Sequence, residues 1–276
     1  MNRELIEQAV RYTSRYVKGD FIDNPVTIQQ KLAHKKIFGV TDLVVKCADK
    51  LGVKEYAKDS LGFDPCPRTL EVYDSPEDVR LSRLPEKFVL KCNHGCGYNI
   101  VQSGSVRLDE NAVRSQLERW LSTNYATVGY ELQYAPIRRR CYAEEYVGDL
   151  SGVKDYKVSC FNGTPMFCQV ISGRGTDRQC MNYYDCKFNY LSLCRMDFPN
   201  NPSVINEKPS SFDRMLEYSE ILSSPFDYVR CDFYEKEGKL YLGEMTFTPG
   251  NARMRYKGDP ETSHLLGAML HISENE

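Results

Sequence analysis

Residues 228–247 read YVRCDFYEKEGKLYLGEMTF, two strand-like runs joined at Gly238. If the chain turns symmetrically about this glycine, Asp232 lies opposite Glu244 and Arg230 lies opposite Thr246. Because side chains alternate between the two faces of a strand, these four polar residues share one face of the predicted hairpin. The other face is predicted to be apolar and consists of Val229, Cys231, Phe233, Met245 and Phe247.

Two facing carboxylates need a neutralising partner. On paired strands their Cβ atoms lie about 5 Å apart, which destabilises the sheet unless a cation intervenes. Mg²⁺ is a suitable cation, because it binds one or two carboxylates together with substrate phosphates. Asp232 and Glu244 are therefore candidate magnesium ligands. The alternative is a solvated sheet face on which Arg230 screens both acids.

A second polar segment follows the predicted strand at residues 87–92. Lys91 stands near the end of this strand, and the next loop, residues 93–99, contains Gly95 and Gly97. Such a loop allows backbone N–H groups to approach an anion, and the lysine adds a point charge for phosphate. The alternative is an ordinary turn, in which His94 is a satisfied loop histidine rather than a phosphate contact.

Residues 143–147 read AEEYV and place two acids in an apolar run. One interpretation is an edge strand with one acid facing water. The other is a hinge strand whose backbone binds an adenine while a glutamate holds an amino or ribose hydroxyl group. The spacing alone leaves both open.

The order of the remaining elements predicts an α+β protein. Residues 1–65 have a polar, helical pattern, which ends at the prolines of Asp64-Pro-Cys-Pro67. A strand at 69–73 and a helix capped by Asp109 complete the first half. The second half is rich in strands, including a hairpin about Asn162-Gly163, with one helix at 212–222.

Composition excludes several classes of protein. The chain has 276 residues, 36 Lys and Arg against 38 Asp and Glu, and a formal net charge of −2. This balance argues against nucleic-acid binding, and no apolar run approaches the roughly 20 residues that span a bilayer. The charged N-terminal stretch does not resemble a signal peptide, so we expect a cytoplasmic protein.

Eleven cysteines are then expected to be reduced thiols that mostly pack in the core. The closest cluster, Cys92-Asn-His94-Gly-Cys96, does not have the spacing of a zinc site.

Five segments in this order resemble a known family, the TupA-like ATP-grasp proteins, which are associated with teichuronopeptide and bacterial surface-polysaccharide synthesis. The resemblance extends from about Lys31, through residues 49–57 and 72–77, almost to the end of the chain. The five segments are FVLKCNHGCGYN at 88–99, AEEY at 143–146, DYKVSCFNG at 155–163, VRCDFY at 229–234 and GEMTFTPG at 243–250.

The resemblance implies an ATP-grasp fold, in which two α+β lobes hold ATP between them. It divides the chain into a helical N-terminal segment at 1–67, a first lobe with the glycine loop at 68–145 and a second lobe with the magnesium-binding hairpin at 146–276. It also implies ATP and Mg²⁺ as cofactors. The role of the N-terminal segment is open, with packing as the simpler interpretation.

Residue roles follow from the resemblance motif by motif. Catalytic roles are expected for Lys91, Lys157, Arg174 and Arg230. ATP contacts are expected from Lys91, Asn93, His94, Gly95, Gly97, Glu144, Glu145, Tyr146 and Val147. The expected metal ligands are Asp232, Glu244 and Thr246, although many ATP-grasp enzymes have asparagine where this chain has Thr246. Arg174, Asp177 and Arg178 are expected to hold an anionic acceptor, unless they form a solvated loop.

The resulting hypothesis is an ATP-dependent carboxylate–amine ligase. It would form an amide, through an acyl phosphate, between a sugar carboxylate such as a uronic acid of a capsular or surface glycan precursor and a small amine or amino acid. Two alternatives are a kinase that phosphorylates a sugar hydroxyl and a non-catalytic module that binds nucleotide or carbohydrate. We expect no nucleic-acid partner and no membrane-spanning segment.

Overall fold

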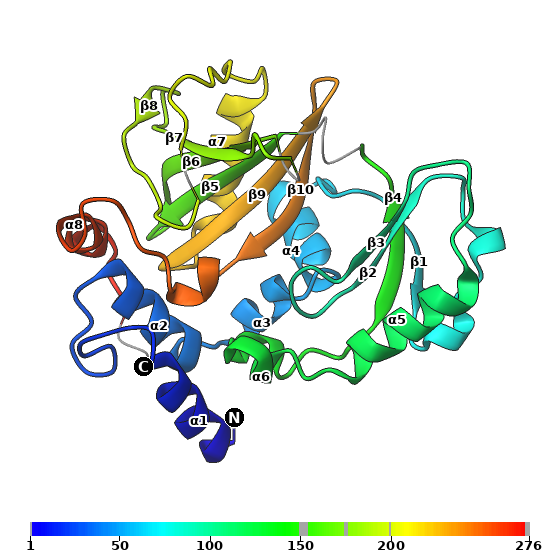
Figure 1. Cartoon of the computed structure of the whole chain (residues 1–276), viewed down its shortest axis with the longest axis horizontal. Helices are drawn as coiled ribbons and strands as arrows, with labels where there is room; N and C mark the ends of the chain where they lie inside the picture. The colour runs from blue at the N-terminus through cyan, green and yellow to red at the C-terminus, as the bar shows by residue number, and fades with distance from the viewer. Residues whose placement is uncertain (1, 149–153, 174–175, 199, 274–276) are drawn as a thin grey trace.

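The computed structural model describes residues 2–148, 154–173, 176–198 and 200–273 of the chain. It is an α+β protein built on two antiparallel sheets that face each other, with α3 and α4 between them (Figure 1). The helices are α1 Arg3–Thr13, α2 Ile28–Phe38, α3 Asp42–Ala48, α4 Gly52–Leu61, α5 Glu110–Ser122, α6 Ala126–Gly129, α7 Phe212–Ser223 and α8 Glu261–Met269. Short 3-10 turns are η1 Pro76–Asp78, η2 Leu81–Arg83, η3 Leu132–Tyr134 and η4 Pro249–Ala252.

The first sheet has four strands in the order β1-β4-β2-β3. Helix α5 covers one face, because Val113 and Leu117 pack into a core with residues of β2 and β4. As predicted, Asp109 caps this helix, accepting a hydrogen bond from the Ala112 N–H at 2.7 Å. The strands are β1 Thr69–Tyr73, β2 Phe88–Cys92, β3 Asn99–Gln102 and β4 Cys141–Glu145.

The second sheet has six strands in the order β10-β9-β5-β6-β7-β8. Helices α3, α4 and α7 pack against one face, and α2, η4 and α8 contribute to a separate core on the other side. The five side chains predicted to form the apolar face of the 228–247 hairpin all lie in the core beneath α3, α4 and α7, so this prediction is confirmed. The strands are β5 Asp155–Phe161, β6 Thr164–Ser172, β7 Cys180–Tyr184, β8 Tyr190–Leu191, β9 Tyr228–Lys236 and β10 Lys239–Thr246.

The β9–β10 hairpin brings the predicted polar pairs together, but not by a symmetric turn. The turn is Glu237-Gly238, both residues with positive φ, so Lys236 pairs with Lys239 and the register starts one residue away from the prediction. A bulge at Gly243 then shifts the register by one. Beyond this bulge Asp232 faces Glu244 and Arg230 faces Thr246, as predicted.

Gly243 is required at the bulge. A Cβ there would lie 2.5 Å from a ring carbon of Tyr234 on the partner strand, closer than van der Waals contact allows.

The prediction that the cysteines pack in the core is confirmed for most of them. Cys141, Cys160, Cys168 and Cys231 are fully buried, and all eleven thiols are free. No group of ligands suited to a metal ion forms around Cys92 and Cys96, or elsewhere among the described residues.

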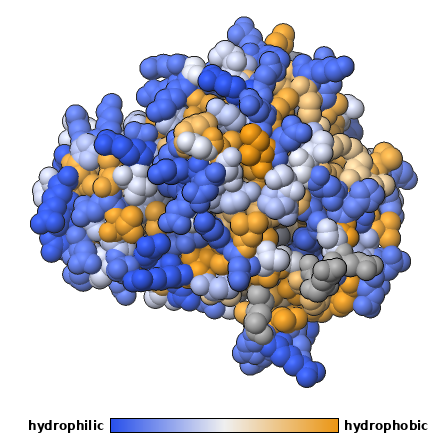
Figure 2. Space-filling model, turned by 180° about the vertical axis from the view of Figure 1, so that it is seen from behind, coloured by the Kyte–Doolittle hydropathy of each residue, from blue (hydrophilic) through white to orange (hydrophobic). Residues whose placement is uncertain are grey.

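The surface combines polar and apolar residues. On the face opposite to that of Figure 1, hydrophobic residues form separate patches among polar ones (Figure 2). No helix in the described ranges has both the length and the hydrophobicity needed to traverse a bilayer.

The β9–β10 turn generates a stability prediction. Glu237 is exposed and has φ 52°, a left-handed conformation that asparagine tolerates better than glutamate. We expect Glu237→Asn to raise the free energy of unfolding by about 0.5–1 kcal/mol, measured by urea denaturation. The matched control is Lys236→Asn, at the neighbouring strand position, which should give no gain. Equal effects of the two changes would show that the turn conformation is not the cause.

Candidate active site

A cleft of about 610 Å³ lies between the two sheets. Residues of β2, β3 and β4 line one side, and residues of β5, β9 and β10 line the other. The loop at 96–98, the segment 146–148, and Lys50 and Pro67 from the N-terminal part of the chain also line it. The residues that line the cleft therefore come from all three segments that the sequence singled out: the glycine loop with its preceding strand, residues 143–147 and the 228–247 hairpin.

One wall of the cleft contains a buried carboxylate held between two lysines. Glu144 of β4 forms ion pairs with Lys91 of β2 and, at 3.0 Å, with Lys54 of α4. Its side chain is 4% exposed. Burial alone would raise the pKa of Glu144, but the charges of Lys91 and Lys54 outweigh burial and lower it. Because β4 is an interior strand, the edge-strand interpretation of residues 143–147 is wrong.

The opposite wall contains a second buried network. The Asp232 carboxylate accepts two hydrogen bonds from the Arg230 guanidinium, at 2.6 and 2.7 Å, and a third from the Lys157 ammonium on the neighbouring strand β5. Arg230 also donates to the hydroxyl of Thr246 at 3.2 Å. Asp232 is 2% exposed, so the predicted alternative of a solvated face is wrong, although Arg230 does screen this acid.

Of the two facing acids of the hairpin, Glu244 is the one that lines the cleft. Its carboxylate lies 3.5 Å from the Lys50 ammonium and 3.5 Å from the Thr246 hydroxyl, and its side chain is 32% exposed. Burial would raise its pKa, but Lys50, Lys157, Arg230 and Lys91 lower it to about 2. Glu244 is therefore an ionised carboxylate at any physiological pH.

The glycine loop lies over the cleft with only part of its predicted residues facing inward. Gly97 lines the cleft, has positive φ, and has open space around it. Gly95 also has positive φ, and its carbonyl accepts a hydrogen bond from the Lys50 ammonium at 2.6 Å. A Cβ on Gly95 would lie 2.4 Å from the Tyr125 ring.

The side chains of Asn93 and His94 do not line the cleft. The Asn93 side-chain amide donates hydrogen bonds to Asp49 and to the Arg138 carbonyl, and it accepts one from the Arg140 N–H. It therefore connects the start of the glycine loop to two other segments of the chain. His94 is buried, and its Nε2 lies 3.1 Å from the Trp120 carbonyl oxygen. Both side chains thus anchor the loop through hydrogen bonds and do not face the cleft.

The end of β4 and the segment after it border the cleft, and the adenine-hinge interpretation of these residues stays a prediction. Glu145, Tyr146 and Val147 are among the lining residues. Glu145 is itself anchored, since its carboxylate accepts a hydrogen bond from the Arg68 N–H at 3.0 Å.

The predicted acceptor loop is only partly described. Arg174 lies outside the described residues, and Asp177 and Arg178 are exposed and not among the residues that line the cleft.

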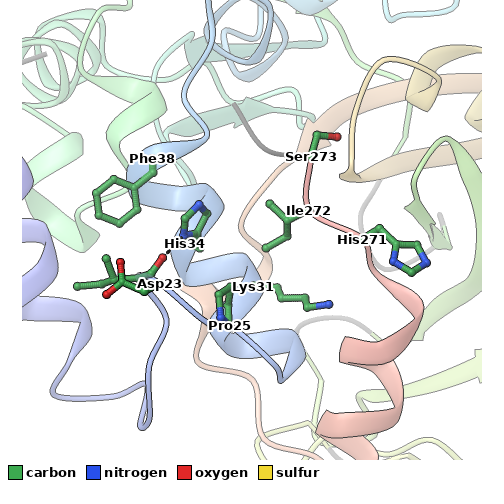
Figure 3. A pocket seen from close by; sticks show the side chains of 9 residues that line it. Asp23, Pro25, Lys31, His34, Phe38, His271, Ile272 and Ser273 are labelled. Carbon is green, nitrogen blue, oxygen red and sulfur yellow. Dashed lines mark hydrogen bonds between the residues drawn. The ribbon is translucent and has the colours of Figure 1, made fainter. Parts of the chain in front are cut away.

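A second cavity, of about 670 Å³, lies between α2 and residues 271–273 (Figure 3). Its polar side chains mostly have structural partners. Lys31 donates to the carbonyls of Gly267 and Leu270 near the end of α8, and the His34 Nδ1 lies 3.0 Å from the Ile22 carbonyl oxygen. Of the charged residues that line it, Asp23 and Lys31, the lysine is already bound by these carbonyls.

Sequence reasoning missed two residues of the site, Lys50 and Lys54. Both lie in the segment DKLGVKEYA at 49–57: Lys50 is in the turn that precedes α4, and Lys54 is in the first turn of that helix. The two lysines, four residues apart where a helix begins, were the available signal. With Lys91, Lys157 and Arg230 they place five cations around the carboxylates of Glu144, Asp232 and Glu244.

Two α+β lobes with a cation-rich cleft between them define an ATP-grasp protein. Residues 29–271 match the family model described as TupA-like ATPgrasp, and the chain belongs to that family. No curated protein is a significant match to the sequence.

Solved structures of ATP-grasp enzymes are distantly similar. The D-alanine–D-alanine ligase of Bacillus anthracis, complexed with ATP, is 17% identical with a TM-score of 0.43, over 73% of this chain and 55% of that one. The D-alanine–D-alanine ligase of Helicobacter pylori is 19% identical with a TM-score of 0.44, over 81% and 58%. The ATP-grasp ligase PsnB, complexed with its minimal precursor, is 12% identical with a TM-score of 0.43, over 82% and 62%. The chain thus spans little more than half the length of these enzymes.

The two acids of the hairpin should differ in their contribution to stability. Asp232→Asn leaves Arg230 and Lys157 buried without their carboxylate, so we expect a loss of about 3–5 kcal/mol in the free energy of unfolding. Glu244→Gln removes a charge whose contacts to Lys50 and Thr246 are longer and which is partly exposed, so it should cost clearly less than Asp232→Asn. Urea denaturation without nucleotide measures both, and equal losses would contradict the assignment of Asp232 to the buried network.

The Glu144 ion pairs predict a pH dependence. Because the folded-state pKa of Glu144 is below its ordinary value of 4.5, its ionised form stabilises the fold above about pH 4.5. This contribution is lost as the pH falls through the folded-state pKa. We expect Glu144→Gln to cost about 2 kcal/mol at pH 7 and progressively less toward pH 3. The control is exposed Glu86→Gln, which should show little difference at either pH. A cost for Glu144→Gln that does not change with pH would contradict this role.

Proposed function

We propose that the protein is an ATP-dependent carboxylate–amine ligase that joins a sugar carboxylate, such as a uronic acid of a surface-glycan precursor, to a small amine or amino acid. The observation that carries the proposal is the opposed charge across the cleft. Five cations surround a site that also presents Glu244, an ionised and accessible carboxylate. ATP brings negative phosphates and a metal ion, and this arrangement accommodates both.

The cleft offers different surroundings to the two ends of ATP. Val89 and Val101 of the first sheet, with residues 145–147, form the more apolar end, which suits an adenine base. Lys91, Lys157 and Lys50 lie on the route toward Glu244, where phosphates would meet positive charge. Gly97, which has no side chain above this route, allows the loop backbone to approach a phosphate.

Glu244 is the residue best suited to hold Mg²⁺. Its oxygens are hard ligands with only long contacts to Lys50 and Thr246, whereas both oxygens of Asp232 are already bound by Arg230 and Lys157. Asp232 and Thr246 are further candidates on the same sheet face. The metal ion would neutralise phosphate charge during phosphoryl transfer.

The proposed reaction has two steps that balance. An oxygen of the sugar carboxylate attacks the terminal phosphorus of ATP, forming an acyl phosphate and releasing ADP. The amine nitrogen then attacks the acyl carbon, so that a C–N bond forms, the C–O bond to phosphate breaks, and one proton and inorganic phosphate leave. Lys91, Lys157 and Arg230 would stabilise the negative charge that develops on the transferred group.

The acyl phosphate must be protected from water. The loop at 93–99 is the candidate lid, because it lies at the cleft while its base is fixed by the Asn93 amide and the His94 ring. The glycan context rests on the resemblance of the five sequence segments to proteins associated with surface-polysaccharide synthesis. A reaction that consumes ATP agrees with a cytoplasmic location.

The test is phosphate release from Mg-ATP, with uronic-acid glycosides crossed against amino acids and amino alcohols and the products identified by mass. We expect release only when one acid and one amine are both present, and a product lighter by one water than their sum. A product that is a phosphoester would establish a kinase. Nucleotide binding without any turnover across the panel would favour a binding module.

Lys91→Met and Glu244→Gln test the site within this assay. We expect each to lower the rate at least about 100-fold, because each removes a charge that acts on the phosphates. The control is Lys31→Met, which alters the cavity beside α2 and should leave the rate within about twofold. Rates close to that of the unaltered protein for both site variants would reject this cleft as the catalytic centre.

A further inference from the structure

Lys50 connects the glycine loop to the β9–β10 hairpin across the cleft. Its ammonium donates a hydrogen bond to the Gly95 carbonyl of the loop at 2.6 Å and lies 3.5 Å from the Glu244 carboxylate of the hairpin. The side chain lines the cleft and is 13% exposed. One cation therefore contacts both the loop proposed to cover ATP and the acid proposed to hold Mg²⁺.

The five cations of the cleft are divided among its three acids. Glu144 and Asp232 each pair with two of them, Lys54 and Lys91 for the first acid, and Lys157 and Arg230 for the second. The fifth cation, Lys50, pairs with Glu244. Because its contact with Gly95 is shorter than its contact with Glu244, the ammonium is held by the loop and lies beside an acid that it can leave.

The backbone of Lys50 is fixed to the base of the loop. Its N–H donates to the Asn93 carbonyl at 3.0 Å. The neighbouring Asp49 carboxylate accepts hydrogen bonds from the Asn93 side-chain amide at 2.9 Å and from the Leu51 N–H at 2.8 Å. Rotation about the side-chain bonds of Lys50 leaves these contacts intact. The ammonium can therefore exchange one nearby acceptor for another while the base of the loop stays in place.

Glu244 has the hard carboxylate oxygens that Mg²⁺ prefers, but in the absence of nucleotide it already has a cationic partner. A divalent cation on this carboxylate would be repelled by the ammonium beside it. The phosphates of ATP remove the conflict, because they offer the ammonium another anionic acceptor. Since an ammonium has three N–H donors, Lys50 can keep the Gly95 carbonyl and direct another donor to a phosphate.

We propose that Lys50 is a positioning residue that makes metal binding at Glu244 depend on the nucleotide. Without nucleotide, Lys50 neutralises Glu244 and opposes the binding of a divalent cation. When ATP enters, the ammonium moves from Glu244 to the phosphates and stays bound to Gly95. This exchange frees the carboxylate for the metal ion and holds the glycine loop beside the nucleotide. The inference rests on the proposed function, because it takes Glu244 as the metal ligand of an ATP-dependent enzyme.

Binding of Mn²⁺ to the full-length protein without nucleotide tests the first half of the proposal. Mn²⁺ replaces Mg²⁺ as the probe, because electron paramagnetic resonance measures the unbound ion directly. We expect Lys50→Gln, which keeps an N–H donor for Gly95 but carries no charge, to tighten Mn²⁺ binding at least tenfold. Lys50→Met should have the same effect. Glu244→Gln, added to either variant, should abolish the gain.

Binding of ATP in the presence of EDTA, measured by equilibrium dialysis, tests the second half. We expect Lys50→Gln to weaken it about tenfold, because the phosphates lose one cation and meet Glu244 without its partner. The matched control in both assays is Lys46→Gln. Lys46 is a lysine of α3 whose side chain is 40% exposed and lies 3.9 Å from Asp59, so the change should alter neither binding constant.

Three results would overturn the proposal: Lys50 variants that bind Mn²⁺ no more tightly than the unaltered protein, a gain that survives Glu244→Gln, or ATP binding in EDTA that Lys50→Gln leaves unchanged. A residue with a purely structural role would not tighten metal binding when it is replaced. Thermal melting of each variant shows that it is folded. Failure of the ligase hypothesis would appear separately, as a phosphoester product in the mass assay.

Discussion

The contact between Arg230, Asp232 and Lys157 is the constraint on which the site depends. Three charges on one sheet face are buried, and such a burial is tolerable only when the groups neutralise one another with good hydrogen-bond geometry. That geometry fixes β9 against β5, because Asp232 must lie opposite Lys157. It also leaves Glu244, the next residue along the same row, as the acid available to a ligand. Asp232, which stabilises the sheet, and Glu244, which is proposed to act in catalysis, are therefore neighbours on one sheet face.

Much of this arrangement could be predicted from residues 228–247 alone. Alternation of side chains along paired strands sufficed to put Asp232 and Glu244 on one face and the apolar residues on the other. The division of tasks between the two acids could not be predicted, because it depends on Lys157 of a different hairpin. The bulge at Gly243 was also missed, since a lone glycine in a strand does not reveal which partner residue it must avoid.

The N-terminal segment shows where local reasoning ends. Its helical pattern was evident from the sequence, but such a pattern does not indicate which residues of other elements a given helical turn will contact. Helices α3 and α4 pack against the second sheet, and this places the Lys50 ammonium in the cleft beside Glu244 and the Lys54 ammonium against Glu144 of the other lobe. The opposite error occurred at Asn93 and His94. Their place in a glycine loop suggested ligand contacts, whereas tertiary partners, the Arg138 and Trp120 carbonyls, turn both side chains away.

The bulge at Gly243 separates the β9–β10 hairpin into two parts with independent registers. The strand ends near Glu237 follow the turn, whereas the ends near Thr246 follow the buried charges of the sheet. Substitutions or insertions at the tip can therefore be absorbed before they reach the acids. The tip can therefore change in sequence or length while the pairing of Asp232 with Glu244 stays aligned, and it is a suitable position for attaching a spectroscopic label.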